Sequence, residues 1–288
     1  MTKGHPEMTP LGPEATPQPA DTHQEEPEAV SRRDFLKTAA IVAVGAMVPA
    51  AALQILAPSH AEAVEPEAAV RWGFLVDTHK CVGCGFCVKA CKQENEVPYE
   101  TSASRTWVER YVVTKDGEVY ADSPMAARDG FITSKIDQGE DGYHDIKPED
   151  VNKALFVPKL CNQCDNPPCV QVCPVGATYQ SPDGVILVDR TWCIGCGYCI
   201  TACPYGARFF HPTYHTAEKC NFCYHRIHKD LRPACVQACP FGARQIANTK
   251  DPNDPTTKII ERERVGVLKS EFGTDPQVFY IGLDEEVR

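Results

Sequence analysis

The sequence predicts an α+β fold in which a duplicated unit of short strands and helices surrounds four groups of cysteines. Three observations lead to this prediction. The chain of 288 residues contains 16 cysteines; they fall into four quartets; and the last three quartets end in the same Cys-Pro-x-Gly-Ala turn. A chain of this length can bury a core of its own, so the cysteines are not needed merely to compensate for small size.

The first 63 residues are predicted to be a targeting segment and not part of this fold. Residues 1–30 are rich in Pro, Glu and Thr and are expected to stay disordered. Arg32 and Arg33 lie in the sequence SRRDFLK, an apolar run follows at 38–57, and Ala61–Ala63 has the small-x-small pattern of a cleavage site. This segment resembles a twin-arginine signal peptide, which implies export to the periplasm and cleavage after Ala63.

An uncleaved membrane anchor is the alternative, because the apolar run approaches the length of a bilayer span. Pro49 and Gln54 weaken that alternative. The twin-arginine route carries folded proteins, so a cofactor can be inserted before export. This resolves an apparent conflict between 16 free thiols and an oxidising periplasm, which otherwise favours disulfides.

The cysteine spacing carries most of the functional information. Two quartets follow the pattern C-x2-C-x2-C-x3-C, which is the bacterial ferredoxin run. The other two have a longer gap before their third cysteine. In chain order, the quartets are Cys81, Cys84, Cys87 and Cys91; Cys161, Cys164, Cys169 and Cys173; Cys193, Cys196, Cys199 and Cys203; and Cys220, Cys223, Cys235 and Cys239.

Three closely spaced thiolates can bind three corners of one cubane cluster, whereas the fourth points toward a neighbouring cluster. The clusters are therefore expected in pairs. Zinc is an alternative because C-x2-C pairs also form zinc knuckles, but a third cysteine in each compact repeat does not suit separate zinc sites. Disulfides would leave the third and fourth cysteines of each quartet without a role. The pattern thus predicts bacterial-ferredoxin-like units that bind iron-sulfur clusters.

The rest of the chain is expected to follow the same duplication. Two short apolar strands, Leu75–Asp77 and Leu187–Asp189, are predicted at the same distance before the first cysteines of the first and third quartets. Further strands are predicted after the Cys-Pro-x-Gly-Ala turns, at 208–210 and 244–246. Quartet one lacks the following proline, so its helix is expected to run on. Three regions result: a signal segment at 1–63, a four-cluster domain at 64–250, and an extension at 251–288.

Residues 92–160, between the first two quartets, contain no cysteine and are predicted to be a β-rich insertion. A hairpin is expected from 107 to 121, with its turn at Asp116 and Gly117. Packing over the first cluster pair and docking of a partner are equal alternatives for the role of this segment.

Charge and composition limit the function classes. The formal net charge of −10 argues against a nucleic-acid partner. Three histidines near quartet four, His215, His225 and His228, are expected to lie at the surface or behind the ligands. Lys219, beside Cys220, is interpreted as an ordinary exposed residue at a turn, with a role in setting a cluster potential as the alternative.

The order of the quartets, the long gap between Cys223 and Cys235, and the Cys-Pro-x-Gly-Ala turns resemble the four-cluster iron-sulfur subunits of the dimethyl sulfoxide reductase family of complexes. The resemblance spans roughly residues 70–250. Exported members are the most similar: those serving tetrathionate, polysulfide or nitrite reduction, periplasmic hydrogenase, or the complex associated with dissimilatory sulfite reduction.

The resemblance implies four [4Fe-4S] clusters whose ligands exchange between quartets. The implied sets are Cys81, Cys84, Cys87 and Cys239 for cluster 1; Cys220, Cys223, Cys235 and Cys91 for cluster 2; Cys161, Cys164, Cys169 and Cys203 for cluster 3; and Cys193, Cys196, Cys199 and Cys173 for cluster 4.

It also implies a periplasmic electron relay, held at the membrane by its partners. The partners would be an integral membrane quinone-interacting subunit and a catalytic molybdopterin or multihaem cytochrome subunit. Two other hypotheses remain from the residues alone: a free-standing periplasmic polyferredoxin, and a catalytic oxidoreductase. The second would need an open iron site or another cofactor, and all 16 cysteines are already used as ligands.

Overall fold

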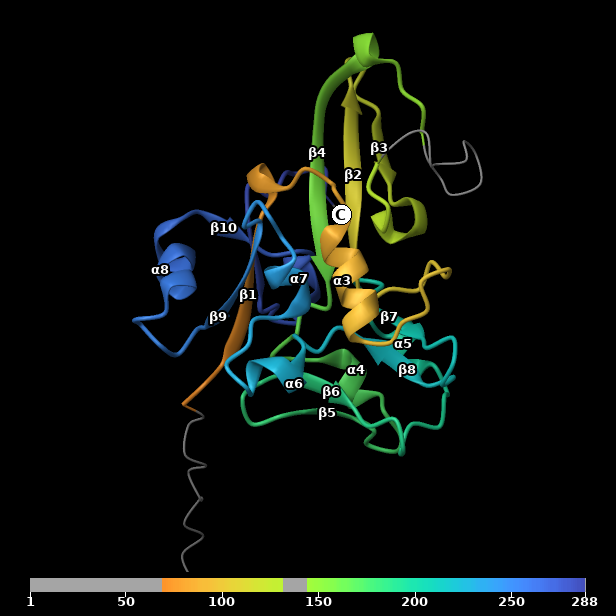
Figure 1. Ribbon diagram of the computed structural model, residues 1–288, viewed down its shortest axis with the longest axis vertical. Coiled ribbons are helices and arrows are strands. Elements are labelled where there is room, and N and C mark those ends of the chain that lie inside the picture. The colour runs from red at the N-terminus through yellow and green to blue at the C-terminus, as the bar shows by residue number, and fades with distance from the viewer. Residues whose placement is uncertain (1–68, 132–143, 288) are drawn as a thin grey trace, which may run out of the picture. The chain divides into compact units, whose positions relative to one another are not determined.

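The computed structural model describes residues 69–131 and 144–287, so the twin-arginine segment and the predicted cleavage site lie outside the described residues. Helices and strands are mixed along the chain, in agreement with the α+β prediction (Figure 1). The strands are β1 (Trp72–Asp77), β2 (Thr106–Thr114), β3 (Val119–Asp122), β4 (Val151–Leu160), β5 (Thr178–Gln180), β6 (Ile186–Val188), β7 (Arg208–Phe210), β8 (Ala217–Lys219), β9 (Arg244–Asn248), β10 (Val265–Gly266) and β11 (Val278–Ile281). The α-helices are α3 (Phe86–Glu94), α4 (Pro168–Gln171), α5 (Tyr198–Thr201), α6 (Tyr224–Ile227), α7 (Ala234–Gln237) and α8 (Pro255–Arg262).

Strand β1 lies inside a four-stranded sheet with the order β10-β11-β1-β9. Its residues Phe74, Leu75 and Val76 are buried. Strand β9 pairs antiparallel with β1, from Trp72 opposite Asn248 to Val76 opposite Arg244. This pairing joins the strand that enters quartet one to the strand that leaves quartet four.

The helices after the cysteine loops reinforce this pairing. Helix α3 packs against α7, and it has nine residues, whereas α4, α5 and α7 have four each. The expected longer helix after quartet one is therefore confirmed. Where Pro174, Pro204 or Pro240 follows the last cysteine, the chain turns instead, because proline cannot continue a helix.

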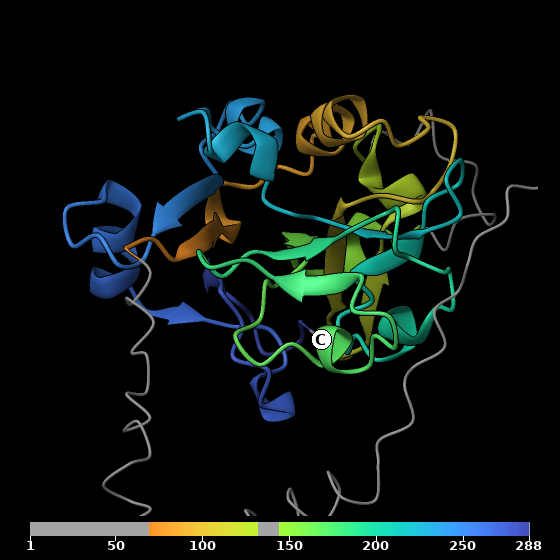
Figure 2. The same ribbon diagram turned by 90° about the horizontal axis from the view of Figure 1, so that it is seen from below.

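A second pair of units is built from two hairpins. Strand β5 pairs with β6 and strand β7 with β8, all antiparallel, and helices α4 and α5 pack against each other. Figure 2 shows β1 and β9 at one side and the β7–β8 hairpin at the other. The strands predicted around Leu187, Arg208 and Arg244 are thus confirmed.

Residues between the first two quartets form a three-stranded antiparallel sheet with the order β3-β2-β4. The predicted hairpin is confirmed as β2 and β3, and Gly117 in its turn has a φ of 90°. This region touches the first cysteine loop. Gly85 has a φ of 75°, and a Cβ there would meet the carbonyl oxygen of Ala127 and lie 2.7 Å from the amide nitrogen of Gly130. The segment that follows β3 thus packs directly over the loop of quartet one.

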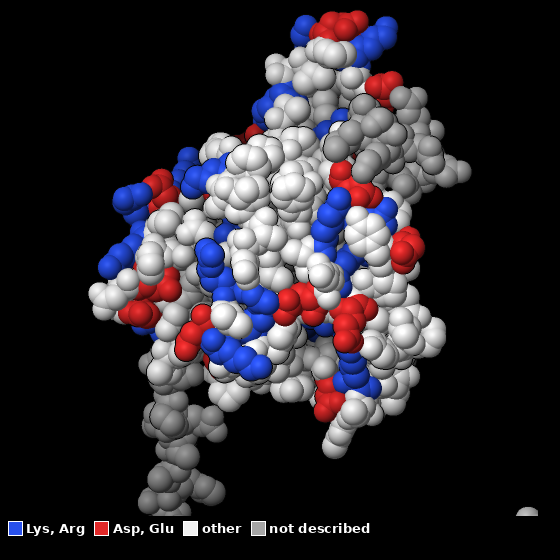
Figure 3. Space-filling view, in the orientation of Figure 1, with Lys and Arg blue, Asp and Glu red and all other residues white. Residues whose placement is uncertain are grey.

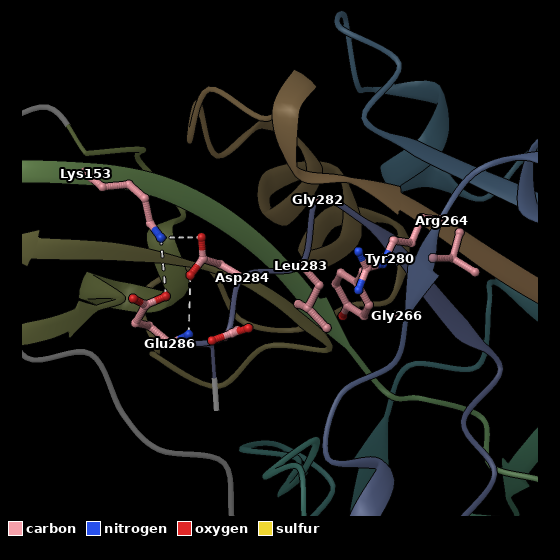
Figure 4. Close-up of a pocket in the computed structure, with 10 residues that line it drawn as sticks. Lys153, Arg264, Gly266, Tyr280, Gly282, Leu283, Asp284 and Glu286 are labelled. Carbon is pink, nitrogen blue, oxygen red and sulfur yellow. Dashed lines mark hydrogen bonds and ion pairs between the residues drawn. The ribbon is translucent and has the colours of Figure 1, made fainter.

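The carboxyl-terminal residues add β10 and β11 to the β1 sheet, with β11 parallel to β1. Lys153 of β4 forms ion pairs with Asp284 and Glu286, and Tyr280 lines the same groove (Figure 4). These contacts tie the end of the chain to the three-stranded sheet. Within the described ranges, no helix has the length and apolarity needed to cross a bilayer.

Candidate metal centres

The first group of cysteines forms where β1 and β9 lead into and out of their loops. Cys81, Cys84 and Cys87 lie between β1 and the first turn of α3, and Cys239 follows α7. All four line one small cavity together with Arg244. Burial is the main cause that raises the pKa of Cys81 to about 11. A thiol in this setting releases its proton only when a cation, such as iron, replaces it.

The second group is the most deeply buried. Cys91 of α3 interacts electrostatically with Cys220, Cys235 and Cys223, and all four residues are buried. Burial is again the largest cause that raises the pKa of Cys235, to about 12, and repulsion from Cys223 adds to it. Cys91 therefore lies with quartet four and not with the rest of its own quartet.

The third group shows the same exchange in the other half of the protein. Cys164 interacts with Cys161, Cys169 and Cys203, and burial raises the pKa of Cys164 to about 12. Cys203 belongs to quartet three by sequence, yet its neighbours here are cysteines of quartet two. One buried thiol also links the two halves, because Cys220 of the second group interacts with Cys161 of the third.

The fourth group is the most exposed. Cys199 is buried and shares a small apolar core with Cys169 and Cys193, whereas Cys196 is exposed. Cys173 follows α4, which packs against α5, the helix that carries Cys199. The packing places the helix that precedes Cys173 against the helix of quartet three.

Amide groups point at several of the sulfur atoms. The backbone N–H groups of Thr178, Ala217 and Phe222 donate to the sulfur atoms of Cys173, Cys193 and Cys220, each over 3.4 Å. At Cys173, burial opposes ionisation, but hydrogen bonds led by that of Thr178 outweigh it and lower the pKa. Such donors stabilise thiolate ligands and help to set cluster potentials.

A side-chain donor reaches the second group through a buried network. Asn95 Nδ2 lies 3.5 Å from the sulfur of Cys91. Asn95 is itself held by Arg105, whose Nη1 donates to Asn95 Oδ1 over 2.7 Å, and Arg105 pairs with Glu218 over 3.0 Å. Sequence reasoning missed these three residues, because nothing in the local pattern marks polar side chains that act from a different element.

The chemistry of these surroundings fits iron-sulfur clusters. Three cationic side chains, Arg208, Lys219 and Arg244, are buried beside the cysteines, and a buried cation is costly unless an anion compensates it. In residues 69–131 and 144–287, no three His, Cys, Asp or Glu side chains are placed to hold a single metal ion. With clusters bound, the cysteine thiolates and the cluster sulfides would supply the negative charge that these three cations need.

The interpretation of Lys219 as an exposed turn residue is wrong. Lys219 ends strand β8 and is 1 % exposed. Its ammonium group donates to the carbonyl oxygens of Ile186 and Cys220. The side chain is buried because the β7–β8 hairpin turns it toward the cysteine groups, which the residue's place next to a cysteine did not reveal.

The three histidines behave as expected, since His215, His225 and His228 are all exposed. His225 contacts Glu94 over 2.7 Å and His228 contacts Asp183 over 2.9 Å. The viewed face of the molecule in Figure 3 carries acidic and basic side chains interspersed, without a large field of one sign.

Comparison with known proteins identifies iron-sulfur relatives of the chain. Two models described as "4Fe-4S dicluster domain" match residues 80–177 and 152–249. The chain is 39% identical to a tetrathionate reductase subunit of Salmonella typhimurium, with 88% of this chain and 89% of the relative covered. It is 40% identical to a tetrathionate reductase subunit of Archaeoglobus fulgidus, covering 74% and 83%. It is 34% identical to an Hdr-like menaquinol oxidoreductase iron-sulfur subunit of the same organism, covering 89% and 100%.

Proposed function

Because the chain belongs to the iron-sulfur subunits of the dimethyl sulfoxide reductase family of complexes, and is an electron-transfer subunit and not a catalytic one, we propose that it relays electrons through four [4Fe-4S] clusters. The observation that carries this proposal is the regrouping of the cysteines. Three of the four groups contain a cysteine that is distant in sequence and near in space. That exchange is what paired cubane clusters require.

The proposed ligands are the four sets that the resemblance implies. Cluster 1 is bound by Cys81, Cys84, Cys87 and Cys239, cluster 2 by Cys220, Cys223, Cys235 and Cys91, cluster 3 by Cys161, Cys164, Cys169 and Cys203, and cluster 4 by Cys193, Cys196, Cys199 and Cys173. The cavity at group one and the electrostatic neighbours within groups two and three support these sets. When bound, each cluster accepts and passes on one electron.

The contacts between groups support a linear order. Arg244 faces cysteines of groups one and two, Cys220 of group two faces Cys161 of group three, and Arg208 faces cysteines of groups three and four. Each group thus neighbours the next in the order 1-2-3-4. A linear array has two ends, which suits a relay between two partners.

Each end of this array carries exposed apolar side chains. Val82, Phe86 and Phe241 lie around group one, and Trp192, Ile194 and Tyr198 lie around group four. Exposed aromatic and aliphatic residues of this kind are typical of subunit interfaces. We assign the two patches to the two redox partners, one at each end.

The partners we propose are an integral membrane subunit that reacts with quinone and a catalytic molybdopterin or multihaem cytochrome subunit. Two relatives are named as subunits of tetrathionate reductase and a third as a subunit of a menaquinol oxidoreductase. These names support a respiratory complex of sulfur-compound metabolism with a quinone at one side. A free-standing polyferredoxin is less favoured, because the relatives are subunits of complexes.

We further propose that the protein works in the periplasm after export through the twin-arginine route, attached to the membrane through its partner. The sequence at Arg32 and Arg33 supports this location. Sequencing the amino terminus of the purified protein tests it. A start at Val64 is expected, whereas a start at Met1 would favour an uncleaved anchor.

Isolation of the complex from native membranes tests the relay. The chain is expected to co-purify with a membrane subunit and a second redox subunit, and a quinol analogue should reduce its clusters only while the membrane subunit is present. A chain that is recovered alone and accepts electrons equally well without partners would contradict the relay and favour the polyferredoxin.

A further inference from the structure

Two buried arginines occupy equivalent positions in the two halves of the protein. Arg208 follows the turn Cys203-Pro-Tyr-Gly-Ala and begins β7, and Arg244 follows Cys239-Pro-Phe-Gly-Ala and begins β9. The third such turn is followed by Thr178, and Arg208 Nη1 lies 3.3 Å from the Thr178 hydroxyl oxygen. The duplication therefore places one arginine with each pair of cysteine groups.

Both guanidinium groups are buried, and each has nitrogen atoms that no oxygen or nitrogen atom of the described residues satisfies. Arg244 is 2 % exposed, and neither its Nη1 nor its Nη2 has an oxygen or nitrogen partner in residues 69–131 and 144–287; the acceptor that the guanidinium approaches is the sulfur of Cys235. Arg208 is 4 % exposed, and its Nε and Nη2 are likewise without oxygen or nitrogen partners among the described residues. A guanidinium with unused donors in the protein interior is strongly unfavourable unless an anion accepts from it.

The surroundings of the two arginines identify that anion. Arg244 lines the cavity of group one with Cys81 and Cys87 and also faces Cys235 of group two. Arg208 faces Cys169 and Cys161 of group three and Cys199 of group four. Each guanidinium thus lies between the two cysteine groups of one pair, and cysteines are the main neighbours that can carry a negative charge.

We propose that Arg244 and Arg208 are matched positioning residues, each of which donates to the sulfur atoms of both clusters of its pair and raises the reduction potentials of those two clusters. Arg244 serves clusters 1 and 2, and Arg208 serves clusters 3 and 4. The inference deepens the proposed function and rests on the cluster sets given there.

The direction of the effect follows from charge. Reduction adds one negative charge to a cluster, and a nearby fixed cation stabilises that reduced form more than the oxidised one. Hydrogen bonds to cluster sulfur act in the same direction. Arginine keeps its charge at any working pH, so its contribution to the potential is constant. A cation shared between two clusters raises both of their potentials together.

Redox titration of the purified full chain, followed by electron paramagnetic resonance, tests the proposal. Arg244→Met and Arg208→Met remove the charge and the donors, while Arg244→Lys and Arg208→Lys keep the charge. The exposed Arg262 provides the control Arg262→Met. Iron content is measured on every variant.

We expect each methionine variant to lower the reduction potentials of two of the four clusters by at least about 59 mV. For a one-electron couple this corresponds to a tenfold change in the reduction equilibrium. The two variants should affect different clusters, the lysine variants should recover most of the change, and the control should show none. Loss of iron in a methionine variant with recovery in the lysine variant also supports the proposal, since the charge then holds the clusters.

Full cluster content with unchanged potentials in both methionine variants would overturn the inference and leave the proposed function intact. Equal loss of iron in the methionine and lysine variants would also overturn it, because the arginines would then be needed only for packing. A wild-type chain that binds no clusters would overturn the proposed function and this inference together.

Discussion

Arg208 and Lys219 lie directly opposite each other in the β7–β8 hairpin, and both side chains are buried. Like charges that face each other across a strand pair are destabilising, and burial increases that cost. Anionic groups nearby offset this cost, and the cysteines beside the pair belong to groups two, three and four. Two buried cations in one hairpin therefore suit an interior that holds negatively charged clusters.

Replacing Lys219 with methionine tests this arrangement. The ammonium group donates to the carbonyl oxygens of Ile186 and Cys220. Gln163 Nε2 also donates to the Cys220 oxygen over 2.6 Å, so Lys219→Met deprives mainly the buried Ile186 oxygen of a donor. We expect the free energy of unfolding to fall by roughly 1–3 kcal/mol, measured by denaturant titration of the cluster-loaded chain. The exposed Lys258 gives the control Lys258→Met, which should change little. A Lys219→Met protein more stable than wild type would show that like-charge repulsion dominates.

Glu218 provides a second test, because it is the carboxylate between two arginines. It lies 3.0 Å from Arg105 and 2.7 Å from Arg190, and Glu218→Gln leaves their charges unpaired. The loss in unfolding free energy should be about 3–5 kcal/mol for this buried pair. The exposed pair of Arg262 and Glu263 is the matched control, and Glu263→Gln should cost less than about 1 kcal/mol. Equal effects of the two substitutions would contradict the buried network.

Gly85 tests the contact between the first cysteine loop and the segment after β3. An alanine at position 85 would have to adopt a positive φ, and its Cβ would clash with the backbone at Ala127 and Gly130. In Gly117→Ala, φ is also positive at 90°, but nothing lies within 4 Å of the added atom. Gly85→Ala should therefore lose iron from cluster 1, whereas Gly117→Ala should show only the conformational cost of roughly 1–2 kcal/mol. Iron analysis distinguishes the two variants. A Gly85→Ala protein with the same iron content as the wild type would show that the loop adjusts to the added atom.

His211 gives a pH dependence near neutrality. Burial is the largest cause that lowers its pKa, and the nearby Arg190 adds to this effect while Glu218 opposes it. Its Nδ1 accepts from the backbone N–H groups of Thr213 and Tyr214, over 3.2 Å and 3.3 Å. The neutral ring is thus the folded form.

Because the folded pKa lies below the ordinary value of about 6.5, the stabilisation is fully present above that pH and is lost as the pH falls below it. We expect the denaturant midpoint of the wild type to fall between about pH 7.5 and about pH 5. His211→Asn keeps an acceptor near the same position, so its midpoint should fall less. Parallel curves for the two proteins would contradict this assignment.

Much of the fold can be predicted from local spacing. The long helix after quartet one, the β2–β3 hairpin and the short strands at 187–188 and 208–210 all follow from the sequence, because proline, glycine and apolar alternation act within a few residues. The identity of the cofactor follows in the same way, since three cysteines within seven residues define one face of a cubane.

The features that sequence reasoning missed depend on contacts distant in sequence. The burial of Lys219 depends on how strands β7 and β8 pair. The link from Glu218 through Arg105 and Asn95 to Cys91 crosses several elements. One signal was available in the sequence: arginine occurs at the same offset after two of the three Cys-Pro-x-Gly-Ala turns. The exchange of cysteines between quartets came from the resemblance and not from spacing alone.

Iron and sulfide analysis of the anaerobically purified chain tests the central claim most directly. Four filled cubane clusters predict about sixteen iron and about sixteen sulfide atoms per chain. About half that content would contradict a four-cluster relay and limit the clusters to one half of the protein, and zinc without sulfide would contradict the iron-sulfur assignment altogether.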